Sequence, residues 1–191
     1  LALAIPDYAG TVIPVTSTIS TTDTTVISDL QVRVNINHTW GGDVHITLTG
    51  PNGTTIDLFD RPGTATCTPG DIGNGNDLVG TYTFSDSAAT NINTALIAGP
   101  SPLASGSYRP STCAGVDASL NGAFAGIPVT GDWTISVSDE DEAIVGTFNS
   151  FELIVNGGTA PCQPVSTTGA CCAGTTCSVT ASGSCTGANT H

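Results

Sequence analysis

The chain has 191 residues, 39% of them hydrophobic, which is enough for one main domain with its own core and a small appendage. Sixteen acidic side chains against three arginines and no lysine give a formal net charge of -13, which would repel a polyanion and argues against nucleic-acid binding. The abundance of Gly, Thr and Ser and the absence of Met favour short strands joined by turns, and so predict an all-β domain.

Residues 1–13 are predicted to form an apolar N-terminal arm ahead of the first strand. The stretch Ala2-Leu3-Ala4 also fits the small-residue cleavage pattern of a signal peptide, so a retained signal-peptide end and a mature arm are both open. The chain has no run of eighteen apolar residues, so no membrane span is predicted. Seven cysteines indicate an oxidising compartment and predict a secreted protein.

Alternation with a period of two predicts the first strands. Residues 30–36 place aliphatic side chains on one face and polar side chains on the other. Residues 44–48 repeat that pattern, Pro51-Asn52-Gly53 reverses the chain, and Ile56 and Leu58 resume the inward face. We therefore expect a hairpin over residues 43–58.

Long loops rich in Gly, Pro, Asn and Ser fill the middle of the chain, from residue 60 to residue 128. Within them, residues 81–85 have the best strand pattern. Because long loops in a sandwich need fastening, we expect Cys67 and Cys113, which lie in two of these loops, to form a disulfide.

Two alternating stretches, residues 133–137 and 151–155, flank a cluster of acids at 139–142. The pattern predicts an antiparallel pair of strands joined by an acidic loop. Phe148 lies three residues before Phe151, which breaks the period of two, so we expect a bulge at Asn149-Ser150.

Residues 157–191 have few core-forming side chains and five of the seven cysteines, so this Cys-rich extension must be held by disulfides or by neighbouring molecules. The domain boundary is expected near Gly157-Gly158. Cysteines without C-x-x-C spacing favour disulfides over zinc, and the odd total leaves one thiol free, paired with another chain, or separated from its partner by truncation. The predicted disulfide cysteines are Cys67, Cys113, Cys162, Cys171, Cys172, Cys177 and Cys185.

Four motifs in order carry a resemblance to a known family: HTWGGDVHITLTGPNGT, FSDSA, GSYRP, and GDWTISVSD followed by GTFNSFEL. Over residues 5–156 the chain resembles the P domain (P/Homo B) of proprotein convertases and of bacterial secreted proteins. The resemblance implies an eight-stranded jelly-roll sandwich, here over residues 14–156. It also implies a non-catalytic module that packs beside a subtilisin-like domain and stabilises it. The Cys-rich extension lies outside the resemblance, and the family pattern does not require a bridge between Cys67 and Cys113.

A search for catalytic residues gives a negative expectation. A serine hydrolase needs an activated Ser, a base and a group that orients the base. His38 with Asp43 imitates part of that arrangement, but no G-x-S-x-G or comparable setting accompanies them. We predict that the chain is not an enzyme.

Calcium is the predicted cofactor, because carboxylates at strand ends and in loops offer the oxygen ligands that this ion prefers. The D-x-D pair at Asp139 and Asp141 favours such a site but lacks the spacing of an EF-hand loop. For any single acid, a solvated turn or a cap on neighbouring amides is the competing interpretation. The predicted ligands are Asp43, Asp77, Asp86, Asp132, Asp139 and Asp141.

Three functions remain open. The first is an extracellular calcium-binding structural or adhesive module that joins copies of itself into filaments through its arm or its Cys-rich extension. The second is an accessory domain that stabilises a secreted subtilisin-like protease. The third is carbohydrate binding through Trp40 and Tyr82, although no obvious aromatic platform exists. Sequons at Asn37 and Asn52 predict glycosylation.

Overall fold

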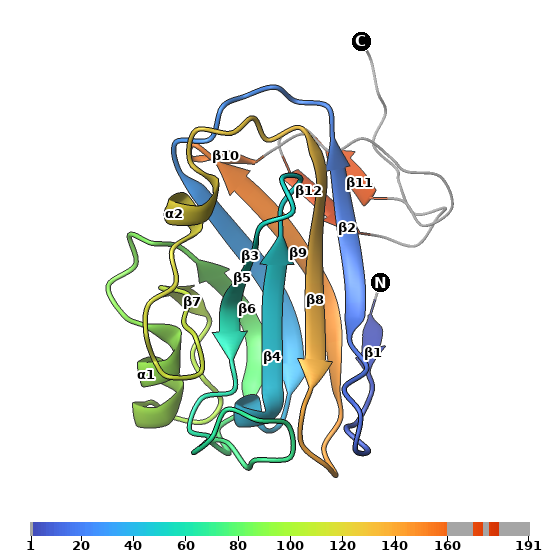
Figure 1. The fold of residues 1–191 in the computed structure, drawn as a ribbon, viewed down its shortest axis with the longest axis vertical. Coiled ribbons are helices and arrows are strands. Elements are labelled where there is room, and N and C mark those ends of the chain that lie inside the picture. Colours follow the sequence, from blue (N-terminus) through green and yellow to red (C-terminus); the bar gives the residue numbers. More distant parts are fainter. Residues whose placement is uncertain (1, 160–169, 174–175, 180–191) are drawn as a thin grey trace.

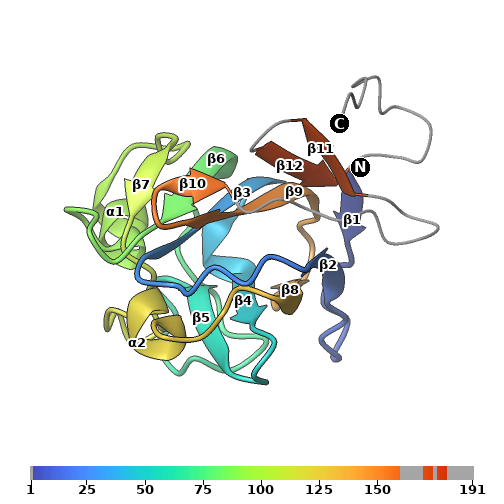
Figure 2. The same cartoon turned by 90° about the horizontal axis from the view of Figure 1, so that it is seen from above.

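The computed structural model describes residues 2–159, 170–173 and 176–179, and it confirms the all-β sandwich (Figure 1). Two sheets pack face to face, and the view from above shows them as two layers (Figure 2). Within the described residues, no helix has both the length and the apolar character needed to cross a membrane. Of the Cys-rich extension, Cys162 and Cys185 lie outside the described residues.

The larger sheet has the strand order β1-β9-β3-β6-β7, with β10 added to β9. Only the β6–β7 pair in it is parallel. Its strands are β1 (Leu3–Ile5), β3 (Leu30–His38), β6 (Leu78–Phe84), β7 (Gly106–Tyr108), β9 (Gly146–Val155) and β10 (Gly158–Thr159).

The second sheet has the order β2-β8-β4-β5 and is antiparallel throughout. Its strands are β2 (Val15–Thr21), β4 (Val44–Thr49), β5 (Thr55–Asp60) and β8 (Gly131–Asp139). In the described part of the chain, three short helices lie in the connections: η1 (Gly41–Asp43), α1 (Ile92–Ala98) and α2 (Leu120–Phe124). A small separate sheet pairs β11 (Ala170–Ala173), which contains Cys171 and Cys172, with β12 (Thr176–Val179), which contains Cys177.

The alternating side chains of both sheets meet in one hydrophobic core. Trp133 of β8 is fully buried, its indole Nε1 donates to the Val129 carbonyl at 2.7 Å, and its ring packs edge-on against Phe124 of α2. Just after β9, the exposed Asn156 accepts hydrogen bonds from the backbone N–H groups of Ser28 and Asp29 through its side-chain Oδ1.

The predicted hairpin over residues 43–58 is confirmed as β4 and β5, and the strand predicted at 81–85 is the end of β6. The prediction that β8 and β9 pair with one another is wrong. They belong to different sheets, and the acidic loop between them crosses from one layer to the other. The reason is that each strand buries its own apolar face, and a sandwich opposes these faces rather than pairing the strands.

The N-terminal arm differs from its expected boundary. β1 pairs with β9 of the same chain, and Ile5 is buried in the core, so the sandwich begins well before residue 14. The backbone of Leu3–Ile5 therefore completes the larger sheet of its own chain instead of extending away from it.

Two bulges interrupt the ladders. In β9 the register changes so that Ser150 faces Asn35 while Phe148 faces Ile36, which confirms the predicted bulge at Asn149-Ser150. In β5 a second bulge, which the sequence pattern did not indicate, leaves Leu58 as the extra residue between the strand partners of Ile46 and Thr47.

Candidate functional site

Ionisable side chains gather at one end of the sandwich, where β3 and β8 end and β4 begins. His38, the last residue of β3, and Asp139, the last residue of β8, both have fully buried side chains. The His38 Nε2 lies 3.2 Å from an Asp139 carboxylate oxygen, and its Nδ1 lies 2.9 Å from the Trp40 carbonyl. The buried partner of the His38 imidazole is thus Asp139 rather than Asp43.

Asp43 lies in η1 beside this pair, and only 2% of it is exposed. Its Oδ1 has no hydrogen-bond partner among the described residues. Burial, followed by the charges of Asp139 and Asp141, raises the pKa of the Asp43 carboxyl to about 7. Three of the six predicted calcium ligands thus lie near one another.

The other three predicted ligands lie elsewhere. Asp86 accepts hydrogen bonds from Ser119, Leu120 and Asn121 and so caps α2, as the competing interpretation of single acids proposes. Asp132 is exposed and accepts from Ser20 at the opposite end of β8, roughly 23 Å from Asp139 at the rise of a strand. The backbone of Asp77 is hydrogen-bonded to Ser101 and Leu103.

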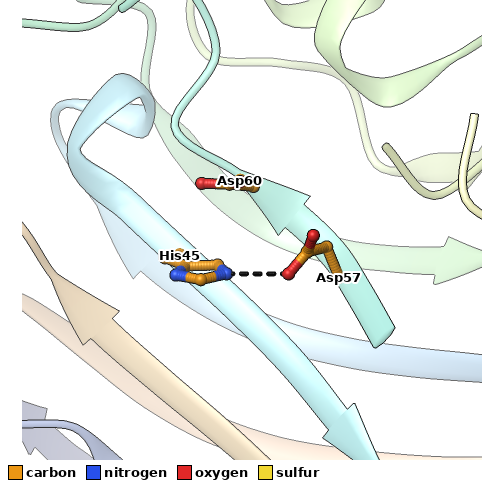
Figure 3. A group of neighbouring side chains, drawn as sticks. All are labelled: His45, Asp57 and Asp60. Carbon is orange, nitrogen blue, oxygen red and sulfur yellow. Dashed lines mark hydrogen bonds and ion pairs between the residues drawn. The ribbon is translucent and has the colours of Figure 1, made fainter. Parts of the chain in front are cut away.

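A second cluster of ionisable side chains lies on the outer face of the β2-β8-β4-β5 sheet. The sequence pattern does not predict it as a metal site. His45, Asp57 and Asp60 each offer one ligand atom, and these three atoms lie within 4.8 Å of one another (Figure 3). They are the one group of three or more His, Cys, Asp or Glu side chains with this geometry in the part of the chain that the structure describes. Asp43, Asp139 and Asp141 do not meet the same criterion.

The β5 bulge explains this cluster. In a regular strand, residues 57 and 60 would point to opposite faces because side chains alternate. Since Leu58 and Phe59 are both buried, the alternation is reset, and Asp57 and Asp60 share the outer face. His45 pairs directly with Asp60 across the ladder, so all three side chains meet there.

The imidazole of His45 lies between two carboxylates. Its Nε2 is 3.0 Å from an Asp57 oxygen and its Nδ1 is 3.1 Å from Glu140 Oε1. Burial opposes the charged form, but the hydrogen bonds to Asp57 and Glu140 outweigh it and raise the pKa of His45 to about 10. Glu140 is itself held by the Ser138 hydroxyl at 3.0 Å, and Arg61 Nη1 lies 3.8 Å from its other oxygen.

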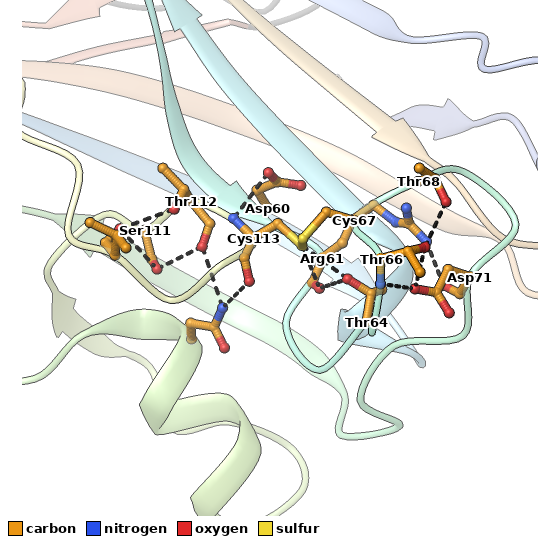
Figure 4. The surroundings of a disulfide bond; sticks show 12 residues. Asp60, Arg61, Thr64, Thr66, Cys67, Thr68, Asp71, Ser111, Thr112 and Cys113 are labelled. Atoms are coloured by element: carbon orange, nitrogen blue, oxygen red, sulfur yellow. Dashed lines mark hydrogen bonds between the residues drawn. A yellow bond between two sulfur atoms is a disulfide. The ribbon is translucent and has the colours of Figure 1, made fainter.

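The predicted disulfide between Cys67 and Cys113 is present and bears on the same cluster (Figure 4). The Cys113 backbone N–H donates to Asp60 Oδ2 at 3.0 Å. Next to Asp60, the side chain of Arg61 is fully buried and donates to the Asp71 carbonyl within the loop that carries Cys67. The disulfide thus connects the loop after β5 to the segment that positions Asp60.

Two glycines set how closely that loop approaches η1. A Cβ on Gly42 would lie 2.0 Å from the Asn74 nitrogen, and one on Gly73 would lie 2.2 Å from the Gly42 oxygen. Any side chain at either position would force the backbones apart. The approach allows the Gly42 N–H to donate to the Asn74 carbonyl at 2.8 Å.

The residues considered for sugars are also placed. Asn37 and Asn52 are both exposed, and their glycosylation stays a prediction. Tyr82 is buried and donates to the Leu103 carbonyl, while the Trp40 indole donates to the Gly73 carbonyl. The buried Tyr82 ring is not available to stack on a sugar, so the structure does not favour the aromatic carbohydrate site.

Comparison with known proteins supports the family resemblance over part of the chain. The family model for the proprotein convertase P-domain matches residues 27–93, the region from β3 to the start of α1. This match contains His38, Asp43, His45, Asp57 and Asp60. Among curated proteins, none matches the chain.

Two solved structures from Aeromonas sobria are similar to the chain. One is the crystal structure of its serine protease, at 18% sequence identity and a TM-score of 0.34, with 84% of this chain and 21% of that chain covered. The other is the complex of that protease with the chaperone ORF2, at 19% identity and a TM-score of 0.34, with 79% and 19% covered. The chain thus spans about a fifth of the length of the structures it matches.

Proposed function

We propose that the chain is a non-catalytic, P-domain-like accessory module that stabilises a secreted subtilisin-like serine protease domain. The observation that carries this proposal is the match of the P-domain family model to residues 27–93, which hold most of the central strands of both sheets. The Cys67–Cys113 disulfide supports an oxidising, extracellular location. The N-terminal arm supports this function over self-assembly, because β1 completes the sheet of its own chain.

The accessory function predicts a partner with serine-protease activity. The folded chain is immobilised and exposed to the secreted proteins of its source. It should bind a protein that a fluorophosphonate probe, which reacts with active serine hydrolases, labels. At an elevated temperature, that protease should lose activity at least tenfold faster without the chain than with it. A chain truncated before β9 serves as the control, because it lacks the strand between β1 and β3. Equal rates of inactivation with and without the chain would contradict the function.

Calcium is proposed at the end of the sandwich where Asp43, Asp139 and Asp141 gather. The proposal is supported by the buried, unpartnered Oδ1 of Asp43 and by the neighbouring carboxylates, whose charge a divalent cation would offset. As the three side chains stand, their ligand atoms are not within 4.8 Å of one another, so the ion would draw them together.

Calcium added to chelator-treated protein is expected to raise the melting temperature more at pH 8 than at pH 5.5. The sign follows from Asp43: its carboxyl, with a pKa of about 7, holds a proton at the lower pH that the ion must displace. Calorimetry measures both melting temperatures, and the Asp132→Asn variant is the control, since that acid lies at the far end of β8. No rise at either pH would rule out this calcium site.

A further inference from the structure

We propose that His45, Asp57 and Asp60 form a binding site for a divalent transition-metal ion, with Zn²⁺ as the best match to the ligands. The site is independent of the accessory function, because it needs no protease partner. Its first support is geometric: an imidazole nitrogen and two carboxylate oxygens lie within 4.8 Å of one another on adjacent strands (Figure 3). Ligand atoms around a tetrahedral zinc ion are about 3.4 Å apart, so only small side-chain movements are needed.

The second support comes from groups outside the cluster. Hydrogen bonds from neighbouring groups already orient two of its three ligands, His45 and Asp60. Metal-bound histidines usually donate their other ring N–H to a carboxylate, which fixes the tautomer. Glu140 occupies that position on His45, with its Oε1 3.1 Å from Nδ1. With Nδ1 donating to Glu140, the other ring nitrogen, Nε2, is the one that points toward Asp57 and is placed to bind the ion.

Asp60 is oriented in the same way by the backbone. The Cys113 N–H donates to Asp60 Oδ2 and leaves the other carboxylate oxygen for an ion. Since Cys113 is bonded to Cys67, the donor is held by a covalent cross-link rather than by a free loop (Figure 4). Second-shell groups of this kind contribute about 10- to 100-fold to metal affinity.

The charges also favour a divalent ion. Asp57, Asp60 and Glu140 supply three negative charges and Arg61 supplies one positive charge, so a divalent ion would bring the formal charge of the group to zero. A mixed set of one imidazole and two carboxylates suits zinc, whereas calcium prefers oxygen ligands alone.

Access for the ion is open. The side chains of His45 and Asp57 are 26% and 32% exposed, so an ion reaches them from solvent without unfolding the sheet. Three protein ligands leave a fourth position for water or for a group of another molecule. The inferred site is therefore a partly buried, solvent-accessible metal site on the adjacent strands β4 and β5.

The test is a calorimetric titration of the full chain, freed of metal by chelator and dialysed, with ZnCl₂ at pH 7.5. The expected result is a binding event with one ion per chain, which Asp57→Asn and His45→Gln each weaken at least tenfold. Glu140→Gln is expected to weaken it about tenfold through the orientation of His45. The matched control is Asp132→Asn, an exposed acid on β8 of the same sheet, which should bind zinc like the unaltered chain.

Cysteines of the C-terminal extension are a competing source of zinc ligands, and Co²⁺ separates the two. Cobalt bound at His45, Asp57 and Asp60 should give visible d–d bands without the intense near-ultraviolet absorption of thiolate ligands. Circular dichroism of each variant checks that the sandwich is folded. Zinc binding that is absent, that survives both Asp57→Asn and His45→Gln, or that shows thiolate absorption would overturn the proposal and leave His45 as an ion-pair residue.

Discussion

Replacing Cys67 and Cys113 together by serine is expected to lower the free energy of unfolding by about 4 kcal/mol. The cross-link spans a sequence separation of 46 residues, and the chain-entropy model gives this magnitude for a loop of that length. Urea unfolding at equilibrium measures the change. The native cross-link also holds the loop that contains Arg61 and Asp71 against the core, so this loop should become accessible to proteases in the variant.

The two single variants, Cys67→Ser and Cys113→Ser, are the controls for this prediction. Each breaks the same bond, so each should cost about as much as the double variant if the cross-link itself provides the stability. A double variant that unfolds at the same urea concentration as the unaltered chain would show that the loop contacts hold without the disulfide.

Asp139→Ala is expected to destabilise the fold by about 3–5 kcal/mol, because it removes one partner of a buried pair. The His38 Nε2 and the Asp141 N–H would both lose the acceptor that Asp139 provides, and the His38 side chain has no exposure to water. Denaturant unfolding measures the effect.

The matched control is Asp132→Ala, the same change in the same strand at an exposed position. Among the residues that the structure describes, the Asp132 side chain hydrogen-bonds with the Ser20 hydroxyl alone, so the free energy of unfolding should change by no more than about 0.5 kcal/mol. Equal losses from the two variants would mean that burial of the His38–Asp139 pair does not govern the stability of this end.

Much of the fold could be predicted from the period-two pattern, because each strand of a sandwich buries one face. The hairpin at 43–58, the bulge at Asn149-Ser150 and the Cys67–Cys113 bridge follow from local signals: a turn sequence, a broken alternation and two cysteines in long loops. The sheet to which each strand belongs is not a local property. For that reason the pattern, which favours pairing of two strands adjacent in the chain, does not reveal that β8 and β9 lie in different sheets.

The candidate metal site was harder to predict than the fold. Asp57 and Asp60 are three residues apart, which in a regular strand places them on opposite faces. The bulge that places Asp57 and Asp60 on one face is hard to recognise in the sequence. Its two apolar residues, Leu58 and Phe59, would also suit a regular strand with both faces covered. The register that the turn sets pairs Thr47 with Asp57 and, if continued, would place His45 opposite Phe59, so the pairing of His45 with Asp60 also depends on the bulge.

The β5 bulge has a second consequence, for solubility. β5 is the outer strand of its sheet, and its edge, where the Ser111 N–H already donates to the Leu58 carbonyl, is a place where another chain could add a strand and begin aggregation. A bulge twists that edge and interrupts the even spacing of its hydrogen-bonding groups, and two carboxylates beside it repel an incoming acidic chain. In a protein with a net charge of -13, a second copy is such a chain. The bulge that brings His45, Asp57 and Asp60 together therefore also disfavours the addition of a strand from a second copy of the chain at this edge of the sandwich.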